Sequence, residues 1–198
     1  MRIPYSPNPP QPQTPEEEAI VARVQARRHP RPLQPLDLAL LHSPPVADGW
    51  NSFLGAVRTQ TTIPADLREL AISRVAVINT AWYEWAHHAP LAVGAGVAQE
   101  AMDWLALQAG DLAEAAVAEE GRRRFNEKQW AVLLISDEMT RKVRVSDETF
   151  ADVKKHFSER EVVEIVTTVA CYNCVSRFLV ALDVGERNSL TPEDAIAH

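Results

Sequence analysis

The distribution of the fourteen prolines is the feature that most constrains the fold, because eleven of them lie before residue 46. Proline fixes the backbone angle φ and has no N–H donor, so this stretch cannot form one continuous layer of long helices. We expect residues 1–45 to form a proline-rich N-terminal arm, most simply a strap over a neighbouring subunit. Residues 46–198 are then expected to form a single domain.

Helical signals dominate the sequence after residue 64. Apolar residues recur at spacings of three and four over residues 64–79, which is typical of an amphipathic helix. Residues 158–182 begin with a capping box, contain no glycine or proline, and are too long for a normal strand despite their β-branched residues. Further helices are predicted over residues 15–28, 82–91, 99–107, 111–120, 126–142 and 147–156, with Pro90 ending or bending the second of these. The sequence therefore predicts an all-α fold.

Composition and charge limit the partners that we expect. With 46% hydrophobic and 24% charged residues, the chain resembles an ordinary globular protein with one core. A net charge of −7 argues against nucleic acid, which is bound by clustered Lys and Arg. Two cysteines are too few for a disulfide framework, the N-terminus does not resemble a signal peptide, and no segment is expected to reach transmembrane length. We expect a cytoplasmic protein with no membrane partner.

The run Ala-Trp-Tyr-Glu-Trp-Ala-His-His at residues 81–88 gathers side chains that can transfer protons. If it is helical, Glu84 and His88 share a face, and an acid with an imidazole suits general acid–base catalysis. Glu69 lies on the preceding predicted helix among apolar residues, which would suit it to donating a proton. The alternative roles are structural: His88 bonded to a neighbour, and Glu69 complementing its helix dipole.

A weak internal repeat sets residues 81–88 over residues 170–177. Glu84 and His88 then correspond to Asn173 and Arg177, so the chain is interpreted either as two related helical hairpins or as a chance identity. Arg177 on an apolar helix suits either a clamp for a substrate carboxylate or a structural salt bridge.

These residues resemble the carboxymuconolactone decarboxylase family, which includes the alkyl-hydroperoxidase D-like proteins. The resemblance covers roughly residues 45–185. Its first block contains Leu-Arg-Glu-Leu at residues 67–70, Tyr-Glu-Trp at residues 83–85 and His88. Its second block contains Tyr172, Asn173 and Arg177. The resemblance implies an alkyl-hydroperoxidase D-like helical fold, a homo-oligomer (trimer or hexamer), and an active site near the helix that carries His88.

The peroxidase branch of that family bears a Cys-x-x-Cys-x-x-x-His helix and a relay glutamate on the helix before it. Matched by position, the relay glutamate falls on Glu69 and the histidine on His88, whereas the two cysteine positions hold Ala81 and Glu84. Disulfide chemistry needs a thiolate and a resolving thiol, which alanine and glutamate cannot supply. The resemblance therefore implies the decarboxylase-like branch.

The sequence leads to the hypothesis of a cofactor-independent enzyme that acts on a small carboxylated lactone, enol or β-keto acid. No cofactor and no metal are expected, because the histidines and acids do not have zinc-ligand spacing. The predicted site consists of a proton donor (His88), residues that orient it and relay protons (Glu69, Glu84), anion contacts (Arg177, Asn173) and hydroxyls for a developing enolate (Tyr83, Tyr172).

Two alternatives remain open. One is an antioxidant hydroperoxide reductase that uses Cys171 and Cys174, although their mid-helix position lacks the helix N-terminus that lowers a thiol pKa. The other is a non-catalytic oligomeric binding protein that kept the fold and lost the reaction.

Overall fold

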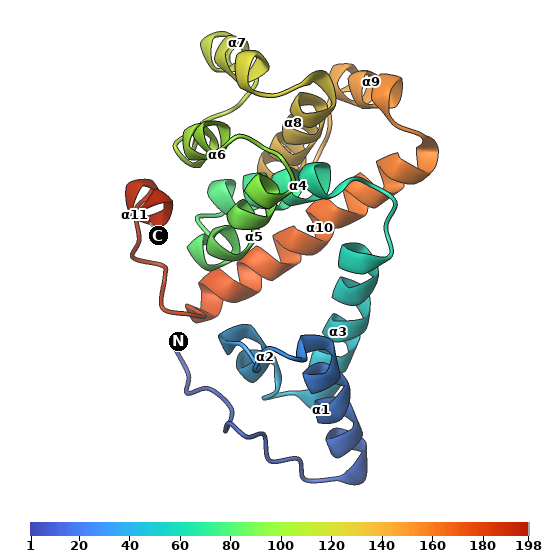
Figure 1. Cartoon of the computed structure of the whole chain (residues 1–198), viewed down its shortest axis with the longest axis vertical. Helices are drawn as coiled ribbons and strands as arrows, with labels where there is room; N and C mark the ends of the chain where they lie inside the picture. The colour runs from blue at the N-terminus through green and yellow to red at the C-terminus, as the bar shows by residue number, and fades with distance from the viewer. Residues whose placement is uncertain (198) are drawn as a thin grey trace. The chain divides into compact units, whose positions relative to one another are not determined.

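The computed structural model describes residues 1–197, in which α-helices are joined by turns and loops and no strand occurs. This confirms the all-α prediction. The helices, shown in Figure 1, are α1 (Pro15–Arg28), α2 (Pro35–Leu40), α3 (Pro44–Thr59), α4 (Ala65–Ile78), α5 (Trp82–Gly94), α6 (Gln99–Ala106), α7 (Ala115–Arg124), α8 (Glu127–Lys142), α9 (Asp147–His156), α10 (Glu159–Leu182) and α11 (Pro192–Ile196).

Contacts along the chain group it into two compact units. The first contains residues 1–60 and residues 182–186, and the second contains residues 61–181 and the C-terminal residues from 187 onward. The boundary predicted at residue 45 lies inside α3 of the first unit, which begins at Pro44. The strap over a neighbouring subunit stays a prediction.

Prolines begin all three helices of the first unit. The predicted helix α1 is confirmed, with Pro15 at its first turn and Thr14 accepting a hydrogen bond from Glu17 as its N-cap. The helices α2 and α3 were not predicted. Their first residues are Pro35 and Pro44, and a proline at the first helical position costs no hydrogen bond.

The ends of the first unit are held by polar contacts. The guanidinium of Arg28 donates two hydrogen bonds to the buried carboxylate of Asp37, at 2.7 and 2.8 Å, and joins α1 to α2. The hydroxyl of Tyr5 accepts from the Gly185 N–H at 2.8 Å and donates to Glu186 at 3.0 Å. The N-terminal segment is thereby fixed to residues 182–186.

The second unit is built around a core between α4, α5, α6 and α8. Within it α10 crosses α4 and α5 (Figure 1). Helix α4 buries almost its whole circumference, since ten of its fourteen residues are buried, and this allows a polar side chain on it to face the interior. The largest members of the core are Leu70, Trp82, Trp85, Met102, Leu105, Trp130 and Leu133.

Helix α10 corrects the expectation that no segment reaches transmembrane length. It has 24 residues, and its most apolar 18-residue window has a mean hydropathy of 1.6, so by length and composition alone it could cross a bilayer. Of that window, 44% is buried inside the structure. The core helix of a globular domain meets the same criteria, and α10 contributes nine buried residues to its unit.

Two further helices differ from their predicted bounds. Helix α5 passes through Pro90 and continues to Gly94, so Pro90 does not end it. Helix α7 begins at Ala115 instead of residue 111, because the carboxylate of Asp111 accepts a hydrogen bond from the Ala113 N–H at 2.9 Å and forms a turn there. By contrast, α9 matches its predicted bounds, and α8 begins one residue after its predicted N-cap.

Candidate active site

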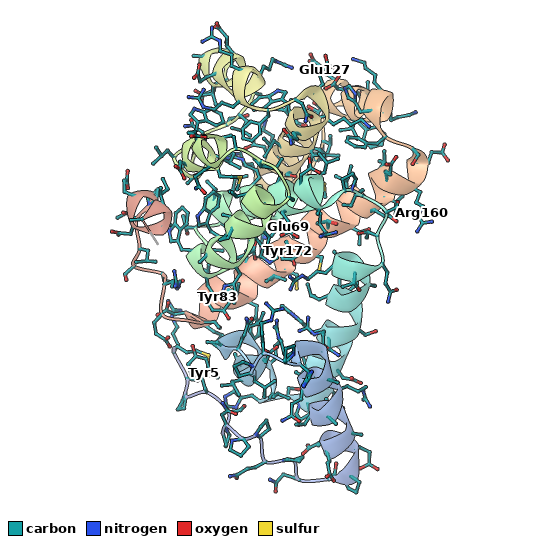
Figure 2. The ribbon with its side chains drawn as sticks, in the orientation of Figure 1. Tyr5, Glu69, Tyr83, Glu127, Arg160 and Tyr172 are labelled. Carbon is teal, nitrogen blue, oxygen red and sulfur yellow. The ribbon has the colours of Figure 1, made fainter. Side chains whose placement is uncertain are left out.

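The predicted acid–base residues meet where α4, α5 and α10 pack together. Figure 2 shows Glu69 of α4 beside Tyr172 of α10. The imidazole of His88, on α5, lies between them: it bonds to Glu69, and its ring centroid lies 4.9 Å from that of Tyr172 in an edge-on arrangement. All three side chains are buried. Residues from three separate helices therefore meet at one interior site.

The contact between His88 and Glu69 is the centre of this site. The Nδ1 atom of His88 lies 2.6 Å from Oε2 of Glu69, and the exposed fractions of the two residues are 6% and 3%. The other carboxylate oxygen, Oε1, accepts a hydrogen bond from Nε of Arg68 at 3.2 Å. A carboxylate on Nδ1 of a histidine fixes the tautomer and orientation of the imidazole, as in catalytic triads, where Nε2 is the nitrogen that exchanges protons.

Glu84 lies one helical turn before His88 on the same helix, as the spacing predicted, and it is also buried. Its two carboxyl oxygens each lie 3.1 Å from Oγ of Ser176 on α10. Burial raises the pKa of Glu84 well above its usual range, and the hydrogen bond with Ser176 opposes this shift. Residues 84 and 88 thus face residues 176 and 172, so α5 and α10 pack in antiparallel register at the site.

The tyrosine and the neighbouring histidine on α5 have separate surroundings. Tyr83 is buried, and its ring centroid lies 4.3 Å from that of His87. His87 is exposed, and its Nδ1 lies 2.7 Å from the backbone oxygen of Tyr83. His87 therefore lies outside the buried group that contains His88. The hydroxyl roles predicted for Tyr83 and Tyr172 remain predictions.

The predicted anion contacts lie on the adjacent face of α10. Arg177 is exposed, and its guanidinium donates to the backbone oxygen and the side-chain oxygen of Asn173 at 2.9 and 2.5 Å. The side-chain amide of Asn173 donates to Thr140 of α8 at 2.9 Å, and its oxygen accepts from Asn79 at 3.2 Å. The structure thus joins these two residues to each other and to α8. Their role in substrate binding remains a prediction.

The two cysteines differ in their surroundings. Cys171 is buried and Cys174 is exposed, and both thiols are free. Burial, together with the nearby Cys174 and Glu84, raises the pKa of Cys171 to about 12. A thiol with that pKa is almost entirely protonated at neutral pH and is a weak nucleophile. Among residues 1–197, no group of three or more His, Cys, Asp or Glu side chains is placed to hold a metal ion.

Two residues of the site were not predicted from the sequence. Ser176, the partner of Glu84, follows Tyr172 by four residues on α10, so helical spacing was an available signal. Arg68 directly precedes Glu69, and side chains one residue apart on a helix do not normally face each other. No sequence pattern indicated that Arg68 would reach back to the Glu69 carboxylate.

Comparisons with known proteins agree with this architecture. Two solved structures of the debrominase Bmp8 superpose on the chain. One is a cysteine-to-alanine variant in complex with 2,3,4-tribromopyrrole, with a TM-score of 0.67, 17% identity, and coverage of 92% of this chain and 90% of that one. The ligand-free debrominase gives a TM-score of 0.65 and 18% identity, with coverage of 92% and 91%.

An uncharacterized peroxidase-related protein from Silicibacter sp. TM1040 has the same fold. Its TM-score is 0.63 at 15% identity, over 94% of this chain and 95% of that one. At such low identities these likenesses show the fold alone. No protein of curated function matches the sequence.

The sequence itself matches the model of the carboxymuconolactone decarboxylase family over residues 44–126. This segment contains Glu69, Glu84 and His88, and it ends before α10, which carries Tyr172 and Ser176. The acid–base residues thus lie within the matched segment, and the long helix that completes their surroundings lies outside it. The match covers less than half of the chain, so it shows a resemblance of this segment to the carboxymuconolactone decarboxylase family, and the solved structures show the shared helical fold.

Proposed function

We propose that this protein is a cofactor-independent acid–base enzyme, a decarboxylase-like lyase that acts on a small carboxylated lactone, enol or β-keto acid. The observation that carries the proposal is the 2.6 Å contact between His88 and Glu69, buried together in a fold of this family. The debrominase structure with 2,3,4-tribromopyrrole is consistent with a fold that accommodates small ring-shaped molecules.

The proposed reaction needs one proton. When the carboxylate of a β-keto acid leaves as CO2, the electron pair of the broken C–C bond passes to the ketone and forms an enolate. Protonated His88 then donates its Nε2 proton to the carbanionic carbon, and water restores that proton. Glu69 holds the imidazole in place and stabilises its charged form. In this proposal Arg177 and Asn173 remain candidate anion contacts, and Arg68 supplies a second guanidinium next to Glu69.

Peroxide reduction is less well supported by the residues present. The two cysteine positions of the peroxidase branch hold Ala81 and Glu84, and the pKa of Cys171 is about 12. A hydroperoxide assay with a dithiol reductant tests this alternative. Turnover that is lost on replacing both Cys171 and Cys174 by serine would favour it over the proposed lyase.

The lyase proposal is tested by CO2 release from a panel of small β-keto acids and carboxylated lactones. Removal of a general acid typically costs about 10²–10⁴-fold in rate, so His88→Gln should lose activity by this amount. Glu69→Gln should also be slower, because it keeps the shape but loses the charge that orients the imidazole. The matched control is His87→Gln, an exposed histidine on the same helix, which should retain the wild-type rate.

Two outcomes would contradict the proposal. If His88→Gln turned over an identified substrate as fast as the wild-type protein, His88 would not be the proton donor. If the protein bound a member of the panel without turnover, the non-catalytic binding protein would be the better description. Cytoplasmic location and homo-oligomeric assembly belong to the same proposal.

A further inference from the structure

The hydroxyl of Ser176 has more oxygen neighbours than it has protons. Its Oγ lies 2.8 Å from the backbone oxygen of Tyr172 and 3.1 Å from each carboxyl oxygen of Glu84. A serine hydroxyl has one hydrogen and accepts through its lone pairs, whereas a backbone carbonyl can only accept. If the hydroxyl donates along the shortest contact, to Tyr172, then the contact with Glu84 is a hydrogen bond only if Glu84 carries the proton.

The surroundings of Glu84 also favour a protonated carboxyl group. In the part of the chain that the structure describes, Ser176 is the one hydrogen-bond partner of Glu84, whose exposed fraction is 2%. A buried carboxylate with one shared hydroxyl and no cation is strongly disfavoured. The thiol of Cys171 on α10 is close enough to interact electrostatically with Glu84, and His88 follows Glu84 by one turn on the same helix.

The other buried acids in residues 1–197 have very different hydrogen-bond and ion-pair partners. Each has at least one arginine or three hydrogen-bond donors. The partners are Arg27, Arg28 and the Gln34 N–H for Asp37; Arg68 and His88 for Glu69; Arg74 and Arg141 for Asp137; and the Ser146 N–H, the Ser146 hydroxyl and the Thr149 hydroxyl for Glu138. Glu84 therefore differs from these four acids in its hydrogen-bond and ion-pair partners, because it has a single hydroxyl as its partner.

We propose that Glu84 is kept as a neutral carboxylic acid and that its O–H is the hydrogen-bond donor for the oxygen of the enolate formed in the site. The part concerning the enolate rests on the proposed function, whereas the protonation state does not. A carboxylic acid kept neutral by apolar surroundings is a strong donor to a developing enolate oxygen. Glu84 then has a different role from Glu69, which pairs with His88.

The local geometry lets Glu84 change partner at little cost. Ser176 keeps its own hydrogen on the Tyr172 carbonyl throughout, so turning the Glu84 O–H toward a substrate breaks a single hydrogen bond. In the reaction the C–C bond to the leaving CO2 breaks and its electron pair forms the enolate. The Glu84 O–H donates a hydrogen bond to the enolate oxygen and keeps its proton, while His88 donates its proton to the carbon. The net reaction consumes one proton from water.

Infrared spectroscopy of the unliganded wild-type protein tests the protonation state without any variant. A protonated carboxylic acid has a carbonyl stretch above the amide I band. We expect such a band at about pH 7, where an ordinary glutamic acid is ionised. Absence of this band at about pH 7, or its loss near the ordinary value of 4.5, would overturn the proposal.

Variants assign the band to its residue. Glu84→Gln preserves the volume of the side chain and should remove the band. The matched control Glu164→Gln replaces a glutamate held by Thr62 and Arg160, and should leave the band unchanged. Ser176→Ala should shift the band to higher frequency because the carboxylic acid loses its partner. A band that persists in Glu84→Gln would show that another acid carries the proton and would contradict the proposal.

The enolate role has its own test, with acetoacetate as the probe. If turnover occurs, Glu84→Gln should lower kcat about 10–100-fold and change KM much less. The reason is that an amide is a weaker hydrogen-bond donor to an oxyanion than a carboxylic acid is. An unchanged kcat would overturn the enolate role. Failure of the proposed function gives a different result, namely no turnover by the wild-type protein while the infrared band is present.

Discussion

At the scale of residues, two glutamates on neighbouring helices have opposite surroundings although both lie in the same apolar interior. Glu69 bonds to Arg68 and His88, whereas the Ser176 hydroxyl is the one hydrogen-bond partner of Glu84 among the described residues. Positive neighbours favour a carboxylate, and burial without them favours a carboxylic acid. Helical spacing placed Glu84 on the face of His88, and the family resemblance added Glu69. The apolar sequence around Glu69 suggested that Glu69 would be the proton donor, whereas in the structure Glu84 is the acid without a charged partner.

Glu84 should make folding stability depend on pH. Its raised pKa means that it stays protonated in the folded state at pH values where it is ionised in the unfolded chain. The folded state then binds the extra proton, so this group makes the free energy of unfolding fall as pH rises above about 4.5, by at most about 1.4 kcal/mol per pH unit. In urea unfolding, Glu84→Gln should therefore gain stability relative to the wild-type protein between about pH 5 and pH 8.

Glu164→Gln is the control for that measurement, because the pH dependence of stability that comes from Glu164 has the opposite sign. Partial burial acts to raise the pKa of Glu164, but the hydrogen bonds from Arg160 and Thr62 outweigh this effect, and the pKa is lowered. That carboxylate stabilises the folded state above its unfolded pKa, and the contribution is lost as pH falls. A stability difference between Glu84→Gln and the wild-type protein that did not change with pH would show that Glu84 titrates normally.

Two arginines are candidates for the substrate carboxylate. The guanidinium of Arg177 is exposed and bonded to Asn173, whereas Arg68 uses its Nε for Glu69 next to the imidazole. A hydrogen bond to a charged group is worth about 1.5–3 kcal/mol, so Arg68→Gln should raise KM for a carboxylated substrate about 10–100-fold. Arg177→Gln should raise KM by a smaller factor, because the guanidinium of Arg177 is exposed and an exposed ion pair contributes less. The reverse order in steady-state kinetics would support the sequence prediction for Arg177.

At the scale of elements, a buried ion pair fixes the loop that precedes the Asp111 turn and α7. The Nε atom of Arg74 donates to Asp137 at 2.9 Å, and other guanidinium nitrogens of Arg74 donate to the backbone oxygens of Gln108 and Gly110, in the latter case at 2.7 Å. Arg141 also donates to the Gly110 oxygen at 2.8 Å. These bonds hold the loop after α6 in a non-helical conformation. A helix predicted from residue 111 could not include this constraint, since it comes from α4 and α8.

The packing of α7 against α8 depends on a glycine. A Cβ atom added at Gly121 would overlap the ring of Trp130, which is buried in the core. Overpacking of this kind typically costs about 1–3 kcal/mol, so Gly121→Ala should lower the free energy of unfolding by that amount. The control is Gly49→Ala in α3, where an added Cβ meets nothing within 4 Å and should stabilise the helix by about 0.5–1 kcal/mol.

Thermal or urea unfolding of these two variants checks the prediction. The difference in sign between them separates the steric effect at Gly121 from the general preference of helices for alanine over glycine. If both variants were stabilised, the ring of Trp130 would be able to move aside, and the close approach of α7 and α8 would not be required.

At the scale of the whole molecule, the chain forms two compact units, and the family segment at residues 44–126 runs from α3 of the first unit into the second. The exposed apolar side chains include Phe150 and Val163, with exposed fractions of 40% and 63%. Such side chains are often covered in assemblies. The resemblance to the family implied a trimer or hexamer, and this remains a prediction about the chain.

Mass measurement in solution decides the assembly. We expect light scattering after size-exclusion chromatography to give three or six times the chain mass of 22.0 kDa. Closed symmetry makes such a mass independent of dilution over a wide range of concentration when the interface is stable. A mass of one chain across that range would contradict the predicted oligomer without affecting the assignment of His88 and Glu69.

The sequence by itself determined the helical class, most helix positions and the pairing of Glu84 with His88 on one face. These follow from capping residues and a period of 3.6, which act over a few neighbouring residues. Only the tertiary structure decided that Glu69 contacts His88, that Ser176 contacts Glu84, and that Arg177 donates hydrogen bonds to Asn173. Contacts between helices depend on which faces pack together, and the same packing sets the burial and neighbouring charge that decide whether an acid is ionised.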